Sequence, residues 1–372
     1  MIKRQLYHQI IEKYHKGKAI VLVGPRQVGK TTLLNTVLRE NKHLFLDGDD
    51  PTVRTLLEKV NTEQLKSIIG GFKFIFIDEA QRILNIGLTL KIITDQFKEV
   101  QLLVSGSSAF ELKNLTNEPL TGRKFQFNLL PISWKEFEDN VGYLKATQQL
   151  EQRILYGMYP DIINNLGEEV ELLTNLSDSY LYKDILSFHE IKKPEILEKL
   201  LQALAYQIGQ EVSFNELSRL LGIDKNTVST YIDILENNYV IFRLPSFCKN
   251  LRTEIKRNQK IYFYDLGIRN AVIKDFRPLS IRQDKGMLWE NFLITERLKS
   301  NLYNKSFAKT FFWRTTRQQE VDYVETLHNS IEAYEFKWNS KQKVKIPKTF
   351  ESTYNVKVNV IDSSNFRVFV DG

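Results

Sequence analysis

Residues 24–31 read GPRQVGKT, which is the complete phosphate-loop pattern G-x-x-x-x-G-K-[ST]. In such a loop the glycines let backbone N–H groups approach phosphate oxygens, and the following helix directs the positive end of its dipole at them. The lysine contacts the β- and γ-phosphates of a nucleotide, and the hydroxyl after it is a ligand of Mg²⁺. We expect a nucleotide site formed by Gly24, Pro25, Arg26, Gln27, Val28, Gly29, Lys30, Thr31 and Thr32.

A pair of carboxylates follows an apolar run in the sequence FIFIDEAQ, where residues 74–77 precede Asp78 and Glu79. Ligands of open α/β sheets lie at the carboxyl ends of the strands, so both side chains are expected beside the phosphate loop. Asp78 is predicted to hold Mg²⁺ through the water shell of the ion, with the Thr31 hydroxyl placed on the ion itself. Glu79 is predicted to be the general base that takes a proton from the attacking water.

Short apolar runs separated by spacers of helical length must position these residues. This pattern is typical of strands in a parallel sheet that is covered on both faces. The sequence therefore predicts an α/β P-loop NTPase domain over residues 1–135, with strands in the apolar runs 19–23, 44–46, 74–77, 102–104 and 125–130.

Two further polar groups are candidates for catalysis in this domain. Ser107, or Ser105 in second place, follows the run 102–104, on a strand expected beside the first, and is predicted to contact the γ-phosphate or the water. The alternative is a plain strand-to-helix turn in which serine caps the helix. Arg123 is predicted at the nucleotide edge of the sheet, where it would reach a nucleotide bound by a neighbouring subunit. The alternative for Arg123 is a surface salt bridge.

Composition sets broad limits on the class of protein. The net charge of +7 and the pI of about 9.1 favour a polyanionic partner only weakly. The single cysteine, Cys248, excludes an intrachain disulfide and fits a reducing compartment, so we expect a cytoplasmic protein. No apolar run reaches the roughly 18 residues that span a bilayer. The basic N-terminus is predicted to form an amphipathic helix packed on the first domain.

The middle of the chain, residues 136–250, is predicted to be a helical lid followed by a winged helix. Ser213 or Asn215 and then Asp224 are suitable helix caps around Gly222, which gives helix-turn-helix spacing. The second helix presents residue types that contact DNA, namely Lys225, Asn226, Thr227, Ser229 and Thr230. A predicted hairpin follows, and after it come the basic residues Lys249, Arg252, Lys256, Arg257 and Lys260. DNA contact is one reading, and an interdomain or protein-contact module is the other.

Residues 251–372 contain the charged pattern of a PD-(D/E)XK nuclease. Glu290 is expected on a helix, Asp322 on a strand, and Glu335 with Lys337 on the next strand. Asp322 and Glu335 would bind Mg²⁺, and Lys337 would help to activate water. Glu320 is a further candidate ligand, and lysines at 341, 343, 345 and 348 follow. The alternative is a catalytically silent scaffold in which the charges form salt bridges.

The segments GPRQVGKTTLL, FLDGDDP, FIFIDEAQR, SGSSAFEL, LTGRKFQFNLLPISWKEF and YLYKDIL, in that order, resemble prokaryotic AAA-type ATPases that carry a C-terminal domain of unknown function. The resemblance covers nearly the whole chain. It implies ATP binding by a P-loop domain of the additional-strand, catalytic-glutamate type. It also implies a helical and winged-helix part and a restriction-endonuclease-like tail.

These observations together predict an ATP-binding, Mg²⁺-dependent ATPase that couples hydrolysis to rearrangement of a DNA- or protein-facing C-terminal half. The trans role of Arg123 would require a homo-oligomer. One alternative is an ATP-gated DNA nuclease that uses Asp322, Glu335 and Lys337. The other is a nucleotide switch that does not hydrolyse ATP.

Overall fold

The computed structural model describes residues 2–107, 119–178, 191, 193–247, 259–341 and 344–371. Ser108, Cys248, Lys343 and the expected basic residues between 249 and 257 lie outside these ranges. The chain contains two compact units, Met1–Ile132 with Asn237–Tyr239, and Ser133–Glu236 with Val240–Gly372. No helix in the described ranges has the length and apolar character needed to cross a membrane.

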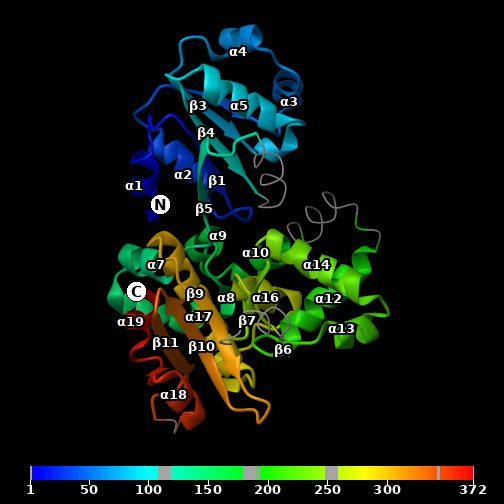
Figure 1. Cartoon of the computed structure of the whole chain (residues 1–372), viewed down its shortest axis with the longest axis vertical. Helices are drawn as coiled ribbons and strands as arrows, with labels where there is room; N and C mark the ends of the chain where they lie inside the picture. The colour runs from blue at the N-terminus through cyan, green and yellow to red at the C-terminus, as the bar shows by residue number, and fades with distance from the viewer. Residues whose placement is uncertain are drawn as a thin grey trace. The chain divides into compact units, whose positions relative to one another are not determined.

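Unit 1 is built on a parallel five-stranded sheet in the order β2-β3-β4-β1-β5 (Figure 1). The strands are β1 (Ala19–Val23), β2 (His43–Asp47), β3 (Phe74–Asp78), β4 (Gln101–Gly106) and β5 (Lys124–Asn128). Every residue of β1, β3 and β4 is buried, because helices cover both faces of the sheet. The predicted α/β fold of this region is confirmed.

The helices of unit 1 begin where the sequence supplies caps. Asp50 accepts a hydrogen bond from Thr52 N at the start of α3, and Asn61 forms a capping box with Gln64 at the start of α4. The apolar faces pack on the sheet around Leu57, Leu65 and Leu90. The helical elements are α1 (Leu6–Ile11), α2 (Lys30–Val37), α3 (Pro51–Glu58), α4 (Thr62–Ile69), η1 (Ala80–Arg82) and α5 (Ile86–Gln96).

The position of β4 between β1 and β3 determines where the polar residues lie. Leu22 pairs with Ser105, and Ile77 pairs with Val104, so the carboxyl ends of the three strands meet at one edge. The serine-bearing strand was expected beside the first strand, and the pairing confirms it.

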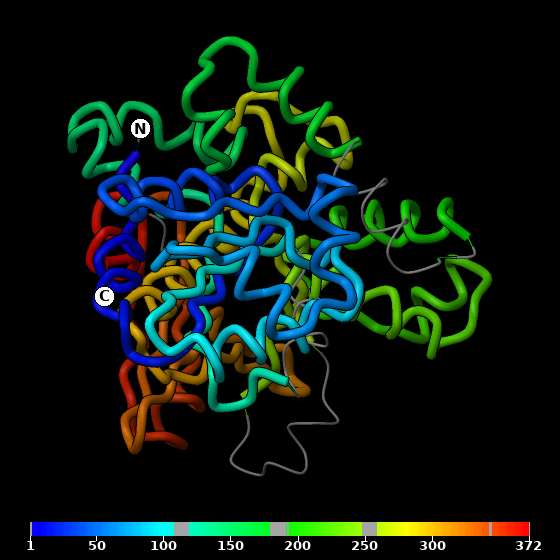
Figure 2. The backbone as a smooth tube through the Cα atoms, turned by 90° about the horizontal axis from the view of Figure 1, so that it is seen from above, coloured from blue at the N-terminus to red at the C-terminus, as the bar shows by residue number. Residues whose placement is uncertain are grey.

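Unit 2 begins with a series of helices, which Figures 1 and 2 draw in green from α7 to α14. In the described ranges they are α7 (Trp134–Val141), α8 (Tyr143–Tyr156), α9 (Pro160–Asn164), α10 (Glu169–Leu176), α12 (Pro194–Tyr206), α13 (Phe214–Leu221) and α14 (Lys225–Asn237). Ser213 caps α13, Gly222 ends it in the left-handed conformation, and Asp224 accepts hydrogen bonds from Asn226 N and Thr227 N. The two predicted helices therefore form with the predicted caps.

A small antiparallel sheet in the order β6-β8-β7 follows these helices. Its strands are β6 (Glu211–Val212), β7 (Ile241–Pro245) and β8 (Gln259–Phe263). Because β8 pairs with both β6 and β7, this sheet contains strands from both sides of position 250, where the sequence analysis placed a domain boundary. Residues on both sides of that position belong to one compact unit, Ser133–Glu236 with Val240–Gly372.

The remainder of unit 2 has a four-stranded sheet in the order β12-β11-β10-β9, in which only the β11–β12 pair is parallel. A long helix precedes the sheet, and a shorter helix connects β11 to β12. The elements are α16 (Leu266–Val272), η3 (Leu279–Ile281), α17 (Lys285–Tyr303), β9 (Lys309–Arg314), β10 (Glu320–Leu327), β11 (Ser330–Phe336), α18 (Lys348–Tyr354), β12 (Val358–Ile361) and α19 (Phe366–Asp371).

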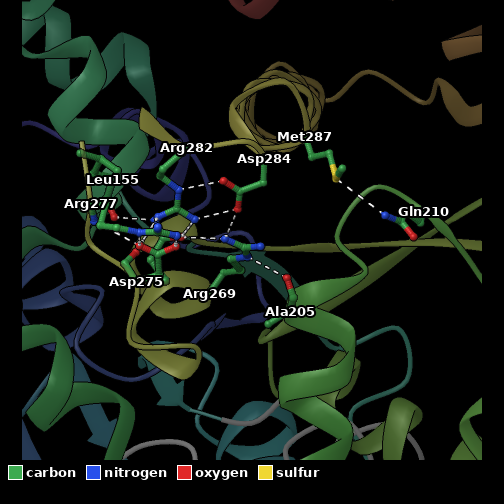
Figure 3. A network of polar contacts seen from close by, with 10 residues as sticks. Leu155, Ala205, Gln210, Arg269, Asp275, Arg277, Arg282, Asp284 and Met287 are labelled. Atoms are coloured by element: carbon green, nitrogen blue, oxygen red, sulfur yellow. Dashed lines mark hydrogen bonds and ion pairs between the residues drawn. The ribbon is translucent and has the colours of Figure 1, made fainter. Parts of the chain in front are cut away.

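An arginine–aspartate network fixes the start of α17 (Figure 3). The buried Arg282 donates two hydrogen bonds to Asp284, and the buried Arg269 donates a third at 2.7 Å. Arg269 also donates to the carbonyl of Ala205 on α12. Burial alone would raise the pKa of Asp284, but the hydrogen bonds and charges of the two arginines hold it below its usual range.

Replacing Asp284 with asparagine is expected to lower the stability of unit 2 at neutral pH, by about 3 kcal/mol at most, because two buried guanidinium groups lose a charged partner. The lowered pKa of Asp284 means that its contribution is complete above about pH 4, the pKa of an unfolded aspartate, and is lost as the pH falls through the folded value. Thermal unfolding at pH 7, 5, 4 and 3 should show a gap between wild type and Asp284→Asn that is constant to about pH 4 and then narrows.

Asp139→Asn is the matched control, because Asp139 is 65% exposed and its ion pair with Lys135 spans 3.6 Å at the surface. It should unfold like wild type throughout. If the difference in thermal stability between wild type and Asp284→Asn is as large at pH 3 as at pH 7, the ionised Asp284 carboxylate is not what stabilises the two arginines.

Candidate functional site

The phosphate loop leaves β1 beside the end of β5. Leu129 N donates to Val23 O at 2.8 Å, and a Cβ on Gly24 would lie 2.0 Å from the carbonyl oxygen of Leu129. Only glycine fits at position 24, because the neighbouring backbone occupies that space. Within the loop, Pro25 and Val28 are buried, Arg26 is half-buried, and Gln27 and Thr32 are exposed.

The ammonium group of Lys30 lies inside the loop, where it donates hydrogen bonds to Gly24 O at 3.0 Å and Pro25 O at 2.7 Å. Burial lowers the pKa of Lys30 to about 8, and the charges of Glu79 and Asp78 oppose this shift. Both of these acceptors are neutral carbonyl oxygens, and phosphate oxygens would pair with the ammonium charge more strongly.

Thr31 at the start of α2 contacts Asp78 at the end of β3, although β4 lies between β3 and the strand β1 that leads into the loop. The Thr31 hydroxyl donates to Asp78 Oδ2 at 2.7 Å, and Ser105 donates to the other oxygen of the same carboxylate. A hydroxyl and a carboxylate at this separation are hard oxygen ligands of the kind Mg²⁺ selects beside phosphates. The residues present therefore fit the metal that the loop implies, and Thr31 and Asp78 are placed where they would hold it.

Glu79 adopts a left-handed backbone conformation (φ 45°, ψ 41°) immediately after β3. This conformation is uncommon for a residue with a side chain and is often found at functional sites. Its carboxylate accepts a hydrogen bond from Gln81 Nε2 at 2.5 Å, and the same nitrogen donates to Ser107 Oγ at 2.8 Å. The structure thus joins Glu79 and Ser107, two of the predicted residues, through a third that the sequence analysis did not single out.

Two other residues that support the site were also missed. Arg4, which is 7% exposed, donates to Val28 O in the phosphate loop at 2.7 Å and to Leu130 O at 2.6 Å. Gly48 N donates to Asp78 O at 2.9 Å, and a Cβ on Gly48 would lie 2.4 Å from Glu79 O. The motif FLDGDDP offered a signal for Gly48, but nothing near Arg4 indicated a role in the loop.

The placement of Arg123 requires a correction. Arg123 directly precedes β5, and its carbonyl accepts from Ala19 N at the start of β1, so it lies at the opposite end of these strands from its own phosphate loop. The expectation that it stands at the nucleotide edge is wrong, because parallel pairing puts strand starts and strand ends at opposite edges. Its Nε donates to Asp95 at 2.7 Å. A role toward another subunit stays a prediction.

In unit 2, α17 and the β10–β11 pair bring the four residues of the predicted nuclease pattern close together; they are Glu290, Asp322, Glu335 and Lys337. Asp322 Oδ2 accepts from Phe336 N at 2.8 Å, and Lys337 donates to Glu335 Oε1 at 2.7 Å. Glu335 Oε2 is buried and has no partner among the described residues. Burial and the charges of Glu290 and Glu335 raise the pKa of Asp322 well above its usual value.

Lys260 on β8 enters the same acidic cluster. Its ammonium lies 2.9 Å from Glu290 Oε1 and 2.5 Å from Glu320 Oε1, and Tyr262 also donates to Glu290 at 2.5 Å. The ammonium therefore occupies the position that a cation between Glu290 and Glu320 would take. In the described ranges no group of three or more His, Cys, Asp or Glu residues is placed to hold a metal ion.

Three family models match successive parts of the chain. Residues 16–138 match an AAA domain, and residues 147–279 and 285–369 match two domains of unknown function, DUF8612 and DUF4143. An uncharacterized protein of Mycobacterium tuberculosis is 27% identical over 89% of this chain and 72% of its own length. Another, from Methanocaldococcus jannaschii, is 24% identical over 87% of this chain and 75% of its own.

Among solved structures, the Walker-type ATPase PABY2304 of Pyrococcus abyssi is similar with a TM-score of 0.52 and 14% identity, covering 73% of this chain and 96% of that chain. At this identity the likeness concerns the fold. Together with the AAA match and the parallel sheet, it identifies the N-terminal part as a P-loop domain of the AAA type.

Proposed function

We propose that unit 1 binds ATP with Mg²⁺ and hydrolyses it, and that turnover changes the relation between unit 1 and a DNA- or protein-facing unit 2. The observation that carries the proposal is the hydrogen bond of 2.7 Å between Thr31 and Asp78, with Glu79 next in sequence. This contact lies at the edge of the sheet where the loop ends, so the residues proposed to hold Mg²⁺ and the proposed general base are close to the proposed phosphate site. A loop that bound nucleotide for structural reasons alone would have no need of a carboxylate after Asp78.

In the proposed reaction, backbone N–H groups of the loop and the start of α2 hold the phosphates. Lys30 leaves the carbonyls of Gly24 and Pro25 and pairs with the β- and γ-phosphate oxygens. Mg²⁺, held by Thr31 and Asp78, would neutralise phosphate charge. Glu79 accepts a proton from water as the water oxygen attacks the γ-phosphorus, and the bond from that phosphorus to the ADP oxygen breaks.

A short path leads from the phosphate loop to the end of unit 1. Arg4 holds Val28 O with one nitrogen and Leu130 O with the other, and Leu130 precedes the unit boundary at Ile132 by two residues. A loop that moves when phosphate binds must therefore carry Arg4 with it or break one of these hydrogen bonds. This supports the proposal that nucleotide occupancy reaches unit 2 through the chain.

DNA is the partner that α13 and α14 favour in this proposal. Lys225, Asn226 and Thr230 are exposed in the N-terminal half of α14. In DNA-binding winged helices, the second helix of this motif enters the major groove with its N-terminal residues. Phosphate release that rises when DNA is added, in proportion to DNA affinity measured against salt, would support this partner.

Replacing Glu79 with glutamine tests hydrolysis. Glutamine keeps the size of the side chain but cannot accept the proton, so phosphate release should fall at least about 100-fold while ATP affinity changes little. Release of inorganic phosphate and binding of a fluorescent ATP analogue measure the two effects. Glu99→Gln, at an exposed position of the same unit, should behave as wild type. If wild type releases no phosphate, even with DNA and at high protein concentration, the protein is not an ATPase and the alternative of a nucleotide switch is supported.

The second candidate is phosphodiester cleavage in unit 2. One observation in its favour is the buried Glu335 Oε2, which has no hydrogen-bond partner among the described residues. The order helix, three antiparallel strands, helix and parallel strand also favours it. The Lys260 ammonium on Glu290 and Glu320 opposes it, since the cluster already has its own counter-charges.

We therefore expect no nicking of supercoiled plasmid by wild type with Mg²⁺ or Mn²⁺, measured by gel electrophoresis with and without ATP. Nicking by wild type that Asp322→Ala abolishes would contradict this expectation and establish the nuclease. Cleavage that survives the substitution would come from a contaminant.

A further inference from the structure

The side chain of Gln81 connects the predicted general base to the adjacent strand. Gln81 lies on η1, two residues after Glu79, and only 8% of it is exposed. Its Nε2 donates to Glu79 Oε2 at 2.5 Å and to Ser107 Oγ at 2.8 Å, so both hydrogens of this nitrogen are used. The two acceptors belong to different strand ends, one after β3 and one after β4.

The chemistry of the acceptor fixes the orientation of the Gln81 amide. An ionised carboxylate only accepts hydrogen bonds, so the nitrogen must face Glu79, and a flipped amide would place two oxygens against each other. The amide oxygen, Oε1, is then directed elsewhere. It is buried and has no partner among the described residues. A buried carbonyl oxygen without a hydrogen-bond donor is unfavourable, so a donor that reaches it is stabilising.

We propose that Gln81 is a positioning residue for hydrolysis, which links the Glu79 carboxylate to Ser107 and so holds it in place. Its Oε1 accepts a hydrogen bond from a donor that is present only when the substrate and the attacking water are bound. This deepens the proposed function and rests on it. Glu79 needs such support because its backbone is in the left-handed region and its side chain is half-buried. The attacking water, which gives one hydrogen to Glu79, has a second hydrogen to donate.

Ser107 has a matching role in this arrangement. Its hydroxyl oxygen accepts from Gln81, so Ser107 acts on Glu79 through the glutamine. The two side chains should therefore behave as one unit in kinetics. Loss of Gln81 removes the connection altogether, and loss of Ser107 only loosens it.

The test is steady-state phosphate release by the full chain with Gln81→Ala, Ser107→Ala and both substitutions, together with ATP affinity. We expect kcat to fall about 10- to 100-fold for Gln81→Ala and less for Ser107→Ala, with ATP affinity within about twofold of wild type. The double variant should be no slower than Gln81→Ala alone, because the serine acts through the glutamine. Gln96→Ala, at an exposed position on α5, is the control.

Two results would overturn the proposal: a kcat for Gln81→Ala equal to wild type, or losses that multiply in the double variant. Gln81→Glu has the same size and provides a second variant if alanine impairs folding; it should also lower kcat at unchanged ATP affinity, because a second carboxylate repels Glu79. An inactive wild type contradicts the proposed function itself, whereas an active wild type with an equally active Gln81→Ala contradicts only the role of Gln81.

Discussion

The parallel pairing of β4 between β1 and β3 is the constraint on which the site in unit 1 depends. It fixes the distance across which Thr31 and Asp78 must meet, and the 2.7 Å hydrogen bond shows that they do. It also places Ser105, on β4, between β1 and β3, where its hydroxyl donates to Asp78 and accepts from Glu79 N. If the register of β4 shifted by one residue, Ser105 would point to the opposite face of the sheet and lose its contact with Asp78.

Much of this site could be predicted from the sequence, because both motifs are local. The glycine spacing of the loop and the four apolar residues before Asp78 each specify a strand and the turn at its carboxyl end. The contacts of Arg4 and Gln81 were out of reach, since they depend on which backbone carbonyl or side chain lies nearby after folding. Arg123 shows the same limit, because its motif indicated a role, while its place at the start of β5 could be known only from strand pairing.

In unit 2 the sequence predicted the helices, their caps and the strands that carry Asp322 and Glu335, but it did not place Lys260 among these charges. Lys260 was grouped with basic residues on a predicted wing, whereas it is 2% exposed and pairs with Glu290 and Glu320. Buried charges are stable only when paired, so an acidic cluster in a fold must obtain its counter-charge from a metal or from the chain. Here β8 supplies it, which is also why residues on both sides of position 250 form one unit.

The central claim is that the loop of residues 24–31 binds the nucleotide phosphates and that Lys30 exchanges backbone carbonyls for phosphate oxygens. A crystal structure of the Glu79→Gln variant with ATP and Mg²⁺ measures this directly. The account predicts the β- and γ-phosphates within the loop of residues 24–31, with Lys30 Nζ on their oxygens and no longer 3.0 Å from Gly24 O and 2.7 Å from Pro25 O. Nucleotide bound elsewhere, with Lys30 still on both carbonyls, would contradict it.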